Sequence, residues 1–158
     1  MDDAIVRRNL TELLEGGSAH LTLDQAIKGL PPALRARRPS GHLKSVWELL
    51  EHLRIAQHDL LHYMTDPGWQ SPPWPDGYWP DPPEVLPEGA WQETLDGFRE
   101  DHRRILELVN NPNLDLTSEV PGGQGHTFLR ELLLVADHNA YHLGQMVDTR
   151  RRLGAWKE

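Results

Sequence analysis

A helical spacing of apolar residues recurs in four segments of the 158-residue chain, and this pattern limits the possible folds more than any other feature. The segments span residues 3–15, 45–64, 88–110 and 127–154. Within the second segment the apolar side chains fall in about 140° of helical arc, the width of face that a bundle helix buries. No segment alternates apolar and polar residues as a half-buried strand does. The sequence therefore predicts an all-α fold.

Capping residues mark where these helices begin and end. Ser45 and Glu48 have the spacing of a capping box, and Thr127 is suited to be the N-cap of the last helix. Gly16 follows the first helix, where glycine readily takes the left-handed conformation of a C-cap. Between the first two long helices, residues 22–29 predict a short helix with a second capping box.

Four amphipathic helices without internal repeats or a domain-scale linker are typical of one four-helix bundle. We therefore expect residues 1–158 to form a single domain. All three connections between the long helices are long crossover loops. Because long crossovers allow parallel as well as antiparallel neighbours, the chain is not restricted to the simplest up-down-up-down path.

Charge and composition argue against several classes of protein. The chain has 24 acidic and 16 basic residues and a net charge of −8, which disfavours a nucleic-acid or anionic-membrane partner. No run reaches the roughly 18 apolar residues of a spanning helix, and the first residues lack the layout of a signal peptide. We therefore expect a cytoplasmic protein. The absence of cysteine removes disulfides, thiolate metal sites and thiol nucleophiles.

The connection over residues 66–87 is unusual because it holds eight of the thirteen prolines together with Trp69, Trp74 and Trp79. Loops of this length inside a compact domain are usually functional or disordered, and the aromatic content argues against disorder. Two interpretations stay open and are compatible. The tryptophans either cover apolar surface at one end of the bundle or form the wall of a substrate pocket.

Two pairs among the nine histidines have the spacing of metal ligands: His138 with His142, and a competing pair, His58 with His62. His138 and His142 are four residues apart on a helix, so both imidazoles project from one face, one turn apart. They do not form a zinc-protease motif, because Asn139 stands where the catalytic glutamate would be. Glu131 and Gln145 share the polar stripe of this pair, and either could contact a substrate or orient a ligand.

The other histidines in predicted helices differ in their position on the helical wheel. His52 lies at the edge of its apolar face and is the better inward-facing donor. His58 and His62 lie far from that face, which predicts two surface histidines. His102 falls near the middle of an apolar stripe, either as a core histidine or as a group beside a ligand or substrate. The residues alone leave open both a metal site and purely structural histidines.

The sequence gives no obvious general base for hydrolysis. Glu131 lies about 10 Å before the histidine pair along the helix, and Asp59 is a weaker candidate that is equally well a solvated acid. Tyr141, beside the pair, could contact a ligand or substrate. The arginines within residues 35–38 and 150–152 could hold an anionic thiol, but basic residues at a helix C-terminus also complement the helix dipole.

Two blocks of sequence, SVWELLEHL and ADHNAYHLGQMVDTRRRLGAW, resemble the DinB/YfiT-like superfamily of metal-binding four-helix bundles. WPDGYWP and TFLRELLLVADHN are similar to one bacterial branch of it. The resemblance extends over nearly the whole chain, and its specific part maps onto His52, His138 and His142. It implies an up-down-down-up bundle, and a homodimer is usual among the relatives.

The resemblance also implies a divalent metal ion at these three histidines, with zinc or nickel expected before iron or manganese. Three neutral imidazoles leave an open coordination position, as in a catalytic site. Because the relatives differ in activity, three functions stay open. These are a metal-dependent hydrolase acting on a small molecule, a transferase using a low-molecular-weight thiol, and a non-catalytic metal- or ligand-binding protein associated with stress.

Overall fold

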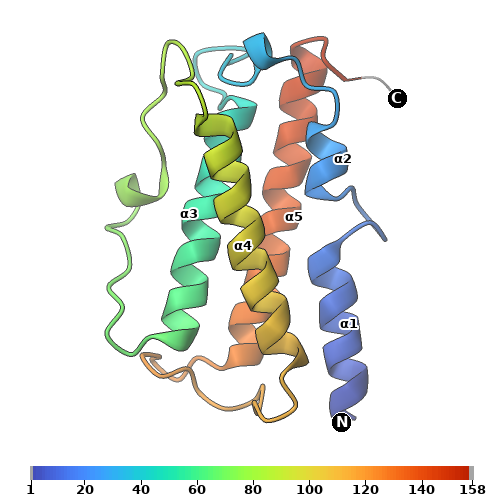
Figure 1. Ribbon diagram of the computed structural model, residues 1–158, viewed down its shortest axis with the longest axis vertical. Coiled ribbons are helices and arrows are strands. Elements are labelled where there is room, and N and C mark those ends of the chain that lie inside the picture. The colour runs from blue at the N-terminus through green and yellow to red at the C-terminus, as the bar shows by residue number, and fades with distance from the viewer. Residues whose placement is uncertain (1, 157–158) are drawn as a thin grey trace.

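The computed structural model describes residues 2–156 (Figure 1). Apart from one isolated bridge between Glu119 and Thr127, these residues form no β-structure, which confirms the all-α prediction. The helices are α1 (Asp3–Glu15), α2 (Leu23–Ile27), α3 (Val46–Thr65), α4 (Ala90–Asn110) and α5 (Phe128–Arg152), with 3-10 turns at Pro32–Leu34 and Asp76–Tyr78. The helix expected from residue 88 begins at Ala90, because Gly89 precedes it with a φ of 84°.

The long helices lie side by side, with α3 packed against both α4 and α5, and α1 against the same two helices. The short α2 packs on α5 and lies beyond the end of α1, so that α1 and α2 occupy one column of the bundle (Figure 1). In Figure 1, α1 and α5 run toward one end of the molecule, whereas α3 and α4 run toward the other.

Each predicted N-cap is present. The Ser45 hydroxyl accepts a hydrogen bond from the Glu48 amide at 3.2 Å, and the Glu48 carboxylate accepts one from the Ser45 amide at 2.9 Å. Thr22 caps α2 with the same reciprocal arrangement, and the Thr127 hydroxyl accepts from the amide of Arg130. These contacts satisfy amides that have no partner within the helix.

Two apolar clusters fill the bundle, one toward each end. The first gathers side chains from the ends of α3 and α4 and the start of α5, among them Met64, Ile105 and Leu132. The second gathers side chains from the starts of α3 and α4 and the end of α5, among them Leu50, Leu95 and Met146. None of the helices within residues 2–156 combines the length and hydropathy needed to cross a membrane.

The start of α3 is held by the fully buried carboxylate of Glu48. It accepts hydrogen bonds from both Arg38 and Ser45, and the Lys44 ammonium lies 3.4 Å away. Burial acts to raise the pKa of Glu48, but the hydrogen bonds from Arg38 and Ser45 and the charge of Arg38 outweigh it and lower the pKa to about 2. The carboxylate is therefore ionised at neutral pH.

Replacing Glu48 by glutamine should lower the free energy of unfolding by about 2 kcal/mol at pH 7, because Arg38 loses its charged acceptor at a buried site. The pKa of Glu48 is below its ordinary value of 4.5 in the folded state. Its contribution is therefore complete above pH 4.5 and disappears as the pH falls toward 2. The difference between wild type and Glu48→Gln in urea unfolding should shrink over that range. Glu107→Gln, in a solvent-exposed pair with Arg103, is the control, and equal stability of all three proteins at pH 7 would contradict the expectation.

Candidate metal centre

Three imidazoles converge where α3 packs against α5. The Nε2 atom of His52 lies 3.1 Å from Nε2 of His138 and 3.1 Å from Nε2 of His142. Potential ligand atoms of all three lie within 4.8 Å of one another, and no other such trio of His, Asp or Glu residues is found within residues 2–156. The two histidines of α5 are one turn apart, so a single residue on the facing helix completes the group.

The imidazoles are neutral at pH 7. Burial lowers the pKa of His52 and of His142, whose side chains are almost fully enclosed. Burial, together with the positive charge that the other two imidazoles would carry, lowers the pKa of His138 to about 4. Neutral imidazole is the form that binds a metal ion, so no proton has to be displaced at neutral pH.

Hydrogen bonds at the opposite ring nitrogens fix two of the rings. Nδ1 of His52 donates to the backbone carbonyl of Tyr78 at 2.7 Å, and Nδ1 of His142 donates to Oε1 of Gln145 at 2.8 Å. Because carbonyl oxygens only accept, each Nδ1 carries the proton and each Nε2 carries a lone pair. Gln145 therefore contacts His142 from the polar stripe that the two residues share.

This arrangement fits a divalent cation. Two lone pairs that face each other at 3.1 Å repel, and a cation between them turns this repulsion into attraction. Two imidazole nitrogens on one tetrahedral zinc ion, each at about 2.0–2.1 Å, would be about 3.3 Å apart, close to the observed spacing. The three-histidine group could therefore hold one metal ion with little movement.

The tryptophan-rich loop over residues 66–87 packs against this group. The ring of Trp79 stacks on the His52 ring with centroids 3.8 Å apart and planes within 3° of parallel. The Tyr78 hydroxyl donates to Asp59 at 2.6 Å, which anchors the residue whose carbonyl holds His52. Trp69 has a different place: its indole N–H donates to the same Asp59 at 2.7 Å, and its ring stacks on His62.

A pocket of about 830 Å³ opens beside the imidazoles. Trp74 and Trp79 line it, whereas Trp69 does not. Tyr141 also lines it and makes an edge contact with the His142 ring. Trp74 and Tyr141 are 78% and 64% exposed, so both are available at its mouth.

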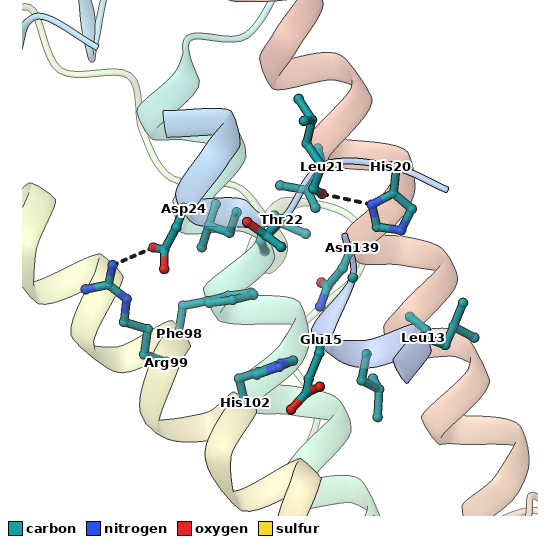
Figure 2. Close-up of a pocket in the computed structure, with 16 residues that line it drawn as sticks. Leu13, Glu15, His20, Leu21, Thr22, Asp24, Phe98, Arg99, His102 and Asn139 are labelled. Atoms are coloured by element: carbon teal, nitrogen blue, oxygen red, sulfur yellow. Dashed lines mark hydrogen bonds and ion pairs between the residues drawn. The ribbon is translucent and has the colours of Figure 1, made fainter. Parts of the chain in front are cut away.

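Two of the residues considered as possible neighbours of a ligand or substrate, Glu131 and His102, lie away from the imidazoles. Glu131 is buried near the start of α5, where it pairs with Arg130 and lies 3.3 Å from Nδ1 of His126. His102 lines a separate pocket of about 170 Å³, where it projects from α4 beside Phe98 toward the end of α1 (Figure 2). The structure therefore does not bring either residue to the three-histidine group.

None of the arginines of residues 35–38 and 150–152 lines the large pocket, and several of them have partners elsewhere. Arg38 binds Glu48, and Arg35 lies over the ring of Trp91. Arg150 donates to backbone carbonyls that join the end of α5 to α2, including that of Lys28 at 2.9 Å. Arg152 pairs with Asp148 at 2.7 Å.

Sequence reasoning missed two groups at the site, the Tyr78 carbonyl and Lys44, and gave too little weight to a third, Asp59. The Tyr78 carbonyl has no side-chain signature, so no pattern could identify it. Asp59 is buried and anchors the loop, whereas the helical wheel also allowed a solvated acid. Lys44 lines the pocket from the residue before the N-cap of α3, and its place just outside a helix start was the one available signal.

Of the comparisons with known proteins, the one with family models gives a match. A family model described as the DinB superfamily matches residues 19–146, which contain all three converging histidines. Searches of curated proteins and of solved structures each give no significant match. The match covers most of the chain and includes α2 to α4 and most of α5. The chain therefore belongs to the DinB superfamily.

Proposed function

We propose that this protein is a metal-dependent enzyme that carries out hydrolase-type chemistry on a small molecule, with one divalent ion held by His52, His138 and His142. The observation that carries the proposal is the convergence of Nε2 atoms at 3.1 Å beside a pocket of about 830 Å³. The protons of His52 and His142 are directed away from the centre, toward Tyr78 and Gln145, which leaves the Nε2 lone pairs of these two rings available to a metal ion.

A bound divalent ion would supply Lewis-acid chemistry, which polarises a carbonyl or phosphoryl oxygen and acidifies water or a thiol. Imidazole ligands suit zinc and nickel best among the expected metals, with iron or manganese as the other candidates. Membership of the DinB superfamily supports a metal at this position but leaves the reaction open.

The chain's own residues would bind and orient the reactants. Trp79 covers one face of His52 and keeps water from that side, while Trp74 and Tyr141 offer exposed rings to a substrate. The only carboxylate lining the pocket within residues 2–156, that of Asp148, pairs with Arg152. The proposed reaction therefore relies on an acidified nucleophile rather than on a carboxylate base.

Within residues 2–156, no unpaired carboxylate lines the pocket. This favours a second candidate as well, a transferase that uses a low-molecular-weight thiol, because a thiol acidified by the metal also needs no base. The helix directions in Figure 1 support the up-down-down-up order that the family resemblance implies. The expected homodimer stays a prediction.

Purified, untagged protein should contain one metal ion per chain, and His138→Ala should lose it, because two imidazoles hold a divalent ion much less tightly than three. Elemental analysis after exhaustive dialysis measures this. His62→Ala is the matched control, since His62 also belongs to a histidine pair spaced four apart but lies outside the group. Metal-free wild type after growth with zinc, nickel, iron or manganese would rule out the proposal.

Replacing Gln145 by leucine should weaken metal binding by about tenfold to a hundredfold, because His142 loses the acceptor that fixes its ring and its protonated nitrogen. Gln145→Glu keeps an acceptor at the same position and should bind at least as tightly as wild type. Competition with a chromophoric chelator measures both. Equal affinity of the leucine and glutamate variants would show that the hydrogen bond does not orient the ligand.

Metal-loaded protein should hydrolyse at least one member of a panel of activated esters, amides and phosphoesters, and His52→Ala should not. The rate should be the same with and without added thiol, because water is the acceptor in this proposal. Product release is followed by absorbance and by mass spectrometry. Consumption of an electrophile only when a low-molecular-weight thiol is added would replace the hydrolase by the transferase.

A further inference from the structure

Lys44 is the only lysine or arginine within residues 2–156 that lines the large pocket. Three contacts hold it there. Its backbone carbonyl accepts a hydrogen bond from the Thr149 hydroxyl at 3.3 Å, which ties it to α5. Its ammonium lies 3.4 Å from the Glu48 carboxylate and 4.6 Å from the centre of the Trp79 ring. The charge is therefore fixed beside the ring that covers His52.

The charges around Lys44 do not cancel. Glu48 carries one negative charge, and the Arg38 guanidinium already binds both of its oxygens. Asp148, the one carboxylate that lines the pocket within residues 2–156, pairs with Arg152. One positive charge therefore remains in excess among Lys44, Arg38, Arg152, Glu48 and Asp148.

Helix stability does not account for a lysine at this position. Lys44 directly precedes Ser45, the N-cap of α3, where the helix dipole favours negative rather than positive charge. Glu48 already provides the acid that this first turn prefers. Because the chain has a net charge of −8, a fixed positive charge in the pocket is also opposite in sign to the charge of the whole protein.

We infer that the substrate is a small molecule with an anionic group, such as a carboxylate, which Lys44 binds while the other end of the molecule reaches the three histidines. This inference rests on the proposed function and names the class of substrate for the same pocket. The exposed rings of Trp74 and Tyr141 suit an apolar or planar segment between the two ends. The pocket volume of about 830 Å³ leaves room for such a molecule.

The test uses hydroxamates as metal-binding probes. Monohydroxamates of succinic, glutaric and adipic acid are compared with partners in which the far carboxylate is replaced by a neutral amide. Binding to zinc-loaded wild-type protein is measured by calorimetry at low salt. At least one acid should bind about fivefold more tightly than its amide, the effect expected of a partly exposed ion pair. Added salt should reduce that preference.

Variants assign the preference to one residue. Lys44→Met should abolish the difference between acid and amide, Lys44→Arg should keep it, and Lys28→Met, which removes a lysine outside this pocket, should leave it unchanged. Metal content is measured for each protein, so that lost charge is separated from a lost metal site. Lys44→Arg keeps the inference testable if the methionine variant does not fold.

Two kinds of failure are distinguishable. If wild type binds no metal, or if no hydroxamate binds the loaded protein, the proposed metal enzyme fails. If the amides bind loaded wild type as tightly as the acids, or if Lys44→Met keeps the preference, the anionic substrate class is overturned while the metal site stands.

Discussion

The packing of α3 against α5 is the constraint on which the site depends. His138 and His142 share a face of α5 because they are one turn apart, and His52 faces them from the edge of the apolar stripe of α3. The same contact buries apolar side chains that adjoin the histidines in the sequence, such as Leu53 and Leu143. The energy that forms the bundle therefore also holds three neutral imidazoles closer together than their lone pairs favour, which is how a folded protein can prepare a metal site in advance.

The loop over residues 66–87 holds the His52 ring that helix packing places beside α5. Asp59, on α3, accepts hydrogen bonds from both Trp69 and Tyr78, so one buried carboxylate fixes two points of the loop. Tyr78 then presents its carbonyl to His52, and its neighbour Trp79 stacks on the same ring. Trp79 both packs against an apolar cluster and lines the pocket, so the two interpretations of this loop are compatible within one residue.

Much of this arrangement follows from the sequence, and the exceptions have physical causes. Helix periodicity and capping boxes locate the helices because these signals are local, and the wheel distinguishes His52 from His58 and His62 because only one helical face meets α5. Glu131 and Gln145 share a stripe, yet only Gln145 lies within a turn of the histidines, so a shared face does not imply a shared site. A backbone carbonyl such as that of Tyr78 depends on the path of a proline-rich loop, which composition does not specify.

The set of functional groups at the site limits the chemistry that the site can carry out. With no cysteine in the sequence, it has no sulfur nucleophile, and the carboxylate lining the pocket within the described residues is paired with arginine. The site thus offers neutral nitrogen donors, aromatic walls and the positive charge of Lys44. In the reaction proposed above, the nucleophile and the proton acceptor would come from solvent or from a second substrate. The pocket would then select its reactants by charge and shape, and the family match, which leaves the reaction open, is compatible with that proposal.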